Sequence, residues 1–180
     1  MKSCLLSIVV IAGIAVIGGA YIYSGLYDIG ADTRHWPITE KIVKIVRERS
    51  IESRAKDITV PNLENPKLVL QGAGQYAAMC ANCHLAPRMD DTGISLGLYP
   101  KPPDLSQTSV DPKVAFWVVK HGIKMSGMPA WGRSHDDLTL WSIVAFVSRL
   151  PGMEPQEYKD IVAKSLADEE IEPRVLKHSH

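Results

Sequence analysis

Two cysteines and a histidine fall within five consecutive residues, Cys80-Ala81-Asn82-Cys83-His84. The Cys-x-x-Cys-His spacing lets two thiols add to the two vinyl groups of one porphyrin while the adjacent imidazole reaches the iron. A covalent porphyrin supplies much of the core of a small domain, so this pentapeptide limits the possible folds more than any other feature. We therefore expect one covalently bound haem, attached through Cys80 and Cys83, with His84 as an iron ligand.

Two other interpretations of the cysteine pair have less support. A zinc site would need a second pair of ligands at a usual spacing, which the sequence does not offer. A thioredoxin-like redox pair would need a βαβ setting, and no strand pattern stands out. The third cysteine, Cys4, lies in an apolar N-terminal stretch, so the three cysteines cannot form a disulfide framework.

The N-terminal residues 4–23 carry no charge and no proline. Their number matches the roughly 20 residues that a helix needs to cross a bilayer. A cleaved secretory signal is the alternative, because Gly18 and Ala20 supply small residues at cleavage-like spacing. The length of the run and the tyrosines around its end, which resemble an interfacial aromatic belt, favour an uncleaved transmembrane anchor. Either way the remainder of the chain is exported.

The chain has 180 residues, enough for one ordinary domain plus flanking segments. Lys plus Arg equals Asp plus Glu at 20 each, so no bulk charge favours nucleic acid as a partner. We predict four segments. They are a transmembrane anchor or uncleaved signal (1–24), an extracytoplasmic linker with an amphipathic helix (25–65), a haem domain (66–152) and a helical or flexible tail (153–180).

Isoleucines and valines recur at near-helical spacing among charged residues from 38 to 58. This pattern predicts an amphipathic helix. Its apolar face could contact lipid headgroups, bind a partner subunit or pack on its own domain.

Three further helices are predicted, over about 67–81, 112–121 and 136–150, with a loop-rich stretch between the first two. Asn65-Pro66 provides an N-cap and first-turn pair for the first of them. Because no strand pattern stands out, the predicted fold class is all-α.

The last of these helices has three possible capping residues, Ser134, Asp136 and Asp137. Its residues at core spacing are Leu138, Trp141, Val144, Ala145 and Leu150. In the tail, one short amphipathic helix is permitted by Tyr158, Ile161, Val162 and Leu166. His178 and His180 form a His-x-His pair that could bind copper or zinc, but two nitrogens make a weak site, so a solvated tail is the preferred interpretation.

Residues from about 67 to 151 resemble the class I cytochrome c family. Gly72, Tyr76 and Cys80 lie four apart on one helical face, as in that family's N-terminal helix, where a glycine and an aromatic pack on the C-terminal helix. Phe146 looks like the aromatic on the partner helix. The resemblance implies a small all-α domain around one haem c, preceded here by a transmembrane helix.

The segment 122–132 resembles the family's ligand loop, in which a methionine next to proline faces the iron. The resemblance therefore implies Met128 as the sixth ligand, with Met125 as the alternative. A thioether stabilises ferrous iron relative to a second imidazole. His121 and His135 flank this loop and could instead give a bis-histidine iron.

In this family a backbone carbonyl from a proline-rich segment accepts a hydrogen bond from Nδ1 of the iron-bound imidazole. Pro100, Pro102 and Pro103 are the candidates, and the sequence does not choose among them. Three tryptophans are expected in the core or against the haem, namely Trp117, Trp131 and Trp141.

A haem iron with both axial positions filled has no open site for substrate, so electron transfer is expected rather than catalysis, and no catalytic residue is predicted. We expect a membrane-anchored one-electron carrier of a bacterial-type respiratory or periplasmic chain. It would lie in the cytoplasmic (inner) membrane with its haem domain outside the cytoplasm, and would exchange electrons with redox proteins there. The alternatives are a fixed haem c subunit of a larger dehydrogenase or oxidase complex and, less favoured, a haem-based sensor.

Overall fold

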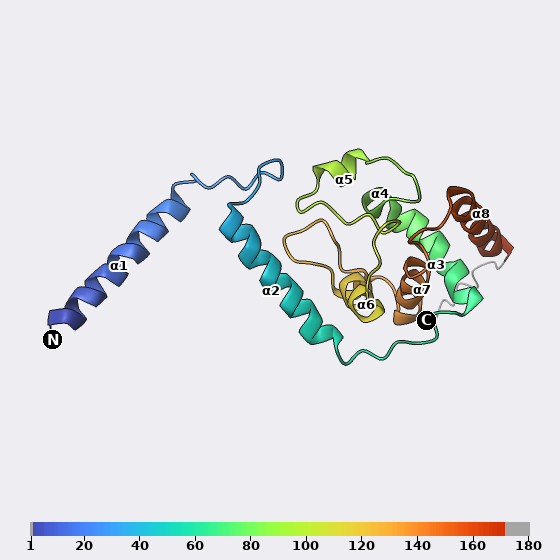
Figure 1. Ribbon diagram of the computed structural model, residues 1–180, viewed down its shortest axis with the longest axis horizontal. Helices are drawn as coiled ribbons and strands as arrows, with labels where there is room; N and C mark the ends of the chain where they lie inside the picture. Colours follow the sequence, from blue (N-terminus) through green and yellow to red (C-terminus); the bar gives the residue numbers. More distant parts are fainter. Residues whose placement is uncertain (1, 172–180) are drawn as a thin grey trace, which may run out of the picture. The chain divides into compact units, whose positions relative to one another are not determined.

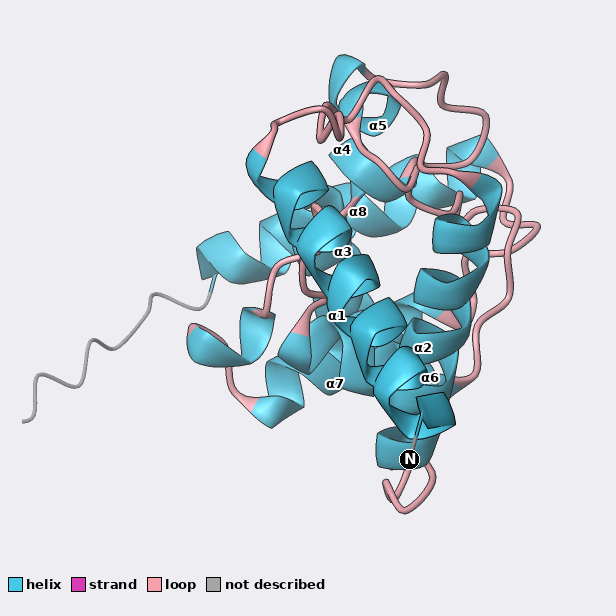
Figure 2. Cartoon of the chain, turned by 90° about the vertical axis from the view of Figure 1, so that its left-hand side faces the viewer, coloured by secondary structure: helices cyan, strands magenta, loops and turns pink. Residues whose placement is uncertain are grey.

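The computed structural model describes residues 2–171, with side chains described for residues 4–167. In chain order its helices are α1 Lys2–Tyr23, α2 Pro37–Ala55, α3 Pro66–Met79, α4 Ala81–His84, α5 Gly93–Gly97, α6 Pro112–His121, the 3₁₀ turn η1 Trp131–Arg133, α7 Asp137–Val147 and α8 Pro155–Ile171 (Figure 1). Figure 2 shows only helices and loops over the described residues, which confirms the predicted all-α class. The chain divides into two compact units, Met1–Arg34 and His35–His180.

Helix α1 makes up most of the first unit. Its stretch Cys4–Tyr23 has 20 residues and a mean hydropathy of 2.5. By length and composition this stretch can cross a membrane, as the sequence predicted. It fits a single-pass anchor.

The second unit is centred on α3 and α7, which pack against each other. Gly72 lies so close to the backbone carbonyl of Ser142 that a Cβ at this position would clash with it. One turn further along, the fully buried rings of Tyr76 and Phe146 meet with their centroids 5.4 Å apart. The packing expected for Gly72, Tyr76 and Phe146 is therefore confirmed.

The helices of this unit begin where side chains can satisfy their first N–H groups. The Asn65 side chain accepts a hydrogen bond from the Lys67 N–H (3.1 Å), with Pro66 as the first helical residue. Helix α6 occupies the predicted residues 112–121 and is capped by Asp111. Of the three candidates for α7, Asp136 is the cap, accepting from the Thr139 N–H at 2.8 Å.

Two core predictions were wrong. Leu138 is 65 % exposed, because it lies in the first turn of α7, one turn before Ser142, where α7 packs closely against Gly72 of α3. Leu140 and Ile143 are buried. In the tail, α8 is longer than the short helix expected and packs on α3. Leu166 is exposed there, and its neighbour Ser165 is buried against Gly74, since only small residues fit where α3 and α8 approach closely.

The predicted loop-rich stretch between Ala81 and Asp111 contains two short helices, α4 at the Cys-x-x-Cys-His sequence and α5 further along. Thr92 and Ser95 form a reciprocal capping box at the start of α5, each side-chain oxygen accepting a backbone N–H at 2.9 Å. Five residues with two glycines carry no readable periodicity, which explains why the sequence pattern did not reveal this helix.

Candidate haem-binding site

The Cys-x-x-Cys-His sequence lies at the end of α3 and forms the short helix α4. The Cys83 and His84 N–H groups donate to the Cys80 carbonyl at 3.0 and 2.8 Å, so one tight turn carries both thiols and the imidazole. Cys80 is buried, while Cys83 and His84 are half-buried. This arrangement brings the three side chains together at one point of the surface of the domain.

The environment of Cys80 favours the neutral form of its free thiol. Burial, with a smaller contribution from Cys83, raises the pKa of Cys80 to about 12. A redox-active cysteine needs the thiolate, so this is not the environment of a reactive thiol. Among the described residues no group of three or more His, Cys, Asp or Glu side chains could hold a metal ion.

The His84 ring is held by a backbone carbonyl. Its Nδ1 lies 2.9 Å from the Pro103 oxygen, which selects Pro103 from the three candidate prolines. Because a carbonyl only accepts, Nδ1 carries the proton and Nε2 keeps its lone pair. Burial lowers the pKa of His84, against a smaller opposing effect of the Pro103 hydrogen bond, so the neutral ring required of a metal ligand is favoured.

Tyr76 also holds the turn that carries His84, a role that the sequence did not reveal. Its hydroxyl donates to the Leu85 carbonyl at 2.5 Å and lies 3.3 Å from the His84 carbonyl, which also accepts from the Leu105 N–H at 3.0 Å. Leu85 has φ 62°, a left-handed conformation that costs energy in a residue with a side chain. Burial raises the pKa of Tyr76, so its hydroxyl stays protonated and acts as a donor.

The predicted ligand loop follows α6 and is stabilised mainly by its own residues. The Ile123 N–H donates to the Met128 carbonyl (3.1 Å). The Ser126 hydroxyl donates to the Ile123 carbonyl (2.8 Å) and accepts from the Met128 N–H (3.2 Å). Gly122 opens the loop at φ 65°, and Gly127 packs against the Leu98 side chain.

The two methionines of this loop have different surroundings. Met128 is half-buried, whereas Met125 is fully exposed and has φ 56°. A haem-facing thioether has to lie on the inner side of the loop, so this difference favours Met128 as the sixth ligand.

The other two histidines near the loop contact tryptophans. His121 packs on Trp117 with the ring centroids 4.9 Å apart, and His135 lies edge-on to Trp131 at 5.6 Å. His135 Nδ1 also lies 2.9 Å from the Ser134 hydroxyl. His178 and His180 lie outside the described residues.

The three tryptophans predicted for the core or the haem wall, Trp117, Trp131 and Trp141, are half-buried. The Trp141 ring is stacked on Phe116, 4.0 Å between centroids and 9° from parallel. Trp131 and Trp141 pack against the hydrophobic core.

Comparison with protein families agrees with this geometry. Residues 67–147 match the family described as cytochrome c oxidase, cbb3-type, subunit III, whose domain is a class I c-type cytochrome. These residues are a c-type cytochrome domain. No curated protein and no solved structure matches the chain. The cofactor of the domain is covalently bound haem c, and the donor set of two thiols and a neutral imidazole with a free Nε2 fits it.

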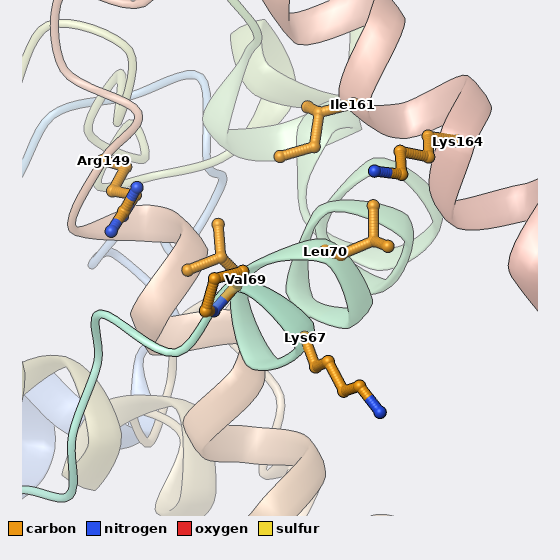
Figure 3. A pocket seen from close by; sticks show the side chains of 7 residues that line it. Lys67, Val69, Leu70, Arg149, Ile161 and Lys164 are labelled. Carbon is orange, nitrogen blue, oxygen red and sulfur yellow. The ribbon is translucent and has the colours of Figure 1, made fainter.

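A separate cleft lies at the other end of α3 of the cytochrome domain. It has a volume of about 400 Å³ and is lined by Pro66, Lys67, Val69, Leu70, Arg149, Ile161 and Lys164. In Figure 3 the Lys67 side chain extends away from Ile161 and Lys164, which come from α8. This set has no thiol, imidazole or thioether, so the cleft has no ligand for haem iron.

Proposed function

We propose that this chain is a membrane-anchored, one-electron carrier whose haem iron is bound by His84 and Met128. The hydrogen bond between His84 Nδ1 and the Pro103 carbonyl carries the proposal, because it fixes the tautomer and direction of the imidazole. The match of residues 67–147 to a cytochrome family supports haem-based electron transfer in general.

Haem c supplies a one-electron iron couple when it is bound. The residues of the chain would keep the same two axial ligands on the haem iron while the iron gains or loses one electron. His84 is held through its ring, its N–H and its carbonyl, and Met128 through a turn closed by Ile123 and Ser126. Rigid ligands of this kind lower the reorganisation needed for each transfer and leave no coordination site for a substrate.

The membrane placement rests on α1. Its apolar stretch fits a single-pass anchor. The attachment of haem c outside the bacterial cytoplasm, which the family resemblance implies, supports a periplasmic or extracytoplasmic position for the cytochrome domain. An anchor also raises the effective concentration of the domain near membrane redox partners.

A redox titration of the purified full chain, combined with exposure of the reduced protein to CO, tests the electron-carrier proposal. We expect one reversible one-electron transition and a reduced spectrum that CO leaves unchanged at neutral pH. Rapid CO binding would contradict a six-coordinate carrier and would support a haem-based sensor instead.

A second candidate is a fixed haem c subunit of a larger membrane oxidase or dehydrogenase complex. The matched family is described as a subunit of cytochrome c oxidase, which favours this candidate. Extraction of native membranes with a mild detergent distinguishes the two. Other subunits that remain bound to the chain through purification would support the complex, and a chain purified alone would support the independent carrier.

A further inference from the structure

Helix α2 has two faces with different surroundings. At its C-terminal end, Ile51 and Ala55 are buried, and the helix packs there on α6. The Lys113 ammonium also donates to the Lys56 carbonyl at the end of α2, 3.0 Å away. The C-terminal half of α2 is therefore attached to the cytochrome domain.

The N-terminal half of α2 carries five exposed aliphatic side chains. Four of them share one side of the helix, and we call these four the α2 stripe; the fifth, Val43, is 50 % exposed and lies about 60° beyond the edge of the stripe. The members of the stripe and their exposed fractions are Ile38 62 %, Ile42 54 %, Ile45 50 % and Val46 62 %. At about 100° per residue these four lie on one side of the helix, roughly 145° around the axis from the centre of the Ile51 and Ala55 face. The stripe thus points away from α6, the helix that covers the other face.

We propose that the α2 stripe lies in the headgroup region of a lipid bilayer and fixes the orientation of the cytochrome domain on the membrane. The proposal rests on the membrane anchoring by α1 proposed above. The 13 residues from 24 to 36 separate α1 from α2, and a chain of that length spans at most about 45 Å. The stripe is therefore confined close to any membrane that α1 enters.

The charge of α2 is consistent with lipid as the occupant. The helix sequence contains five Lys and Arg residues and three Glu residues, a net charge of 5 − 3 = +2. Lys41 lies beside the stripe, and Arg49 follows it one turn further along. Basic side chains next to an apolar face are typical of helices that lie in the membrane interface.

A second protein is a poorer occupant for the stripe. Four aliphatic side chains are a small part of the roughly 20–30 residues on each side of a standard protein interface. After Val46 the same side of the helix continues with Arg49 and Ser53, so the apolar surface ends after about three turns.

Helix α2 is attached to the cytochrome domain at both ends, so a membrane contact of the stripe would also orient the domain. Just before α2, the His35 ring packs edge-on against Tyr99 at 5.2 Å, and the Tyr99 hydroxyl lies 3.4 Å from the His35 N–H. Tyr99 belongs to the segment that continues to Pro103, the partner of His84. A membrane contact through the stripe therefore sets the direction in which the haem-binding side of the domain faces.

Spin labels on the full-length holoprotein test this proposal. Single cysteines replace Ile42 in the stripe, Glu40 about 160° around the helix, or Ile11 in α1, each in a Cys4→Ser background. The haem spectrum confirms that each variant is folded. The proteins are reconstituted in vesicles of equal parts phosphatidylcholine and phosphatidylglycerol, and the accessibility of each label to oxygen and to a water-soluble nickel chelate is measured.

We expect the Ile42 label to be several-fold more accessible to oxygen relative to the chelate than the Glu40 label. Equal chelate accessibility at both positions would overturn the proposal, and so would an Ile42 label shielded from both reagents, which indicates coverage by protein. The Ile11 label reports the anchor separately. If Ile11 is shielded from the chelate while Ile42 is not, the anchoring stands and only the stripe proposal fails.

Discussion

The two sides of the haem site are held in different ways. On the His84 side, contacts come from two parts of the chain, namely the end of α3 with Tyr76 and Cys80, and the segment that contains Pro103 and Leu105. On the Met128 side, the hydrogen bonds are made within the loop itself, by Ile123 and Ser126.

Because of this difference, changes on the two sides of the site should affect different properties, namely the stability of the domain and the properties of the haem iron. A change on the His84 side disturbs contacts between distant segments, so it should lower the stability of the whole domain. A change in the self-contained Met128 loop should alter the iron while the α3–α7 core stays intact.

The largest effect is expected for Cys80→Ala/Cys83→Ala. Without thioether bonds, haem is lost on purification, and the domain loses a ligand that stabilises only its folded state. Acid–acetone extraction and circular dichroism measure the two losses. Cys4→Ser, which changes an exposed cysteine, is the control and should retain covalent haem. Covalent haem in the double variant would contradict the assigned attachment sites.

Gly72→Ala should lower the free energy of unfolding by about 3 kcal/mol or more, since overpacking at a closely packed contact cannot relax easily. The new Cβ would clash with the Ser142 backbone, which belongs to helix α7 rather than to a flexible side chain. Denaturant unfolding of the holoprotein measures the change. Gly93→Ala is the matched control, because a Cβ there meets nothing within 4 Å. Equal stability of both variants would show that α3 and α7 are not packed as described.

Tyr76→Phe removes the hydroxyl that bonds the Leu85 carbonyl and should cost about 1–3 kcal/mol, because a buried acceptor loses its partner. The counterpart in the Met128 loop is Ser126→Ala, which removes two local hydrogen bonds of a half-buried side chain. It should cost no more than about 1 kcal/mol. Chemical unfolding of both variants compares the two sides directly, and a larger loss for Ser126→Ala would reverse the comparison.

The smallest effect concerns Asp136, the exposed cap of α7. Its hydrogen bond from the Thr139 backbone, and to a lesser degree the nearby His135, lower its pKa from the usual 3.8. A lowered folded-state pKa means that this contribution to stability is present above pH 3.8 and is lost as the pH falls below it through the folded-state pKa. Unfolding of Asp136→Ala should therefore show a weaker pH dependence than the native protein in that acidic range. An unchanged pH dependence would remove Asp136 as a cap.

Much of the fold could be predicted from local signals. Asn65-Pro66 and the Asp111-Pro112 pair mark helix starts by chemistry that acts over two or three residues. The resemblance of Gly72 and Tyr76 to the N-terminal helix of class I cytochromes c implied the contact with α7. Leu138 was misplaced because an apolar residue in the first turn fits the core spacing, although the close contact with α3 begins one turn later, at Ser142. Only the packing of the helices decides such a position.

In the site, too, local features could be predicted from the sequence, whereas features that depend on the folded path of the chain could not. The pentapeptide at Cys80 identifies thiols and imidazole because they belong to one turn. Pro103 could not be distinguished from Pro100 and Pro102, since all three offer the same carbonyl and only the path of the loop brings one to His84. The role of the Tyr76 hydroxyl depends on the left-handed turn at Leu85, which cannot be predicted from residue spacing.

The central proposal, an iron held between His84 and Met128, is tested most directly by the oxidised absorption spectrum of the full-length protein and two variants. The native protein and Met125→Ala should both show the weak sulfur-to-iron charge-transfer band at the red end of the spectrum, and Met128→Ala should lack it. A band that survives Met128→Ala but disappears in Met125→Ala, or that is absent from the native protein, would contradict the proposed ligand.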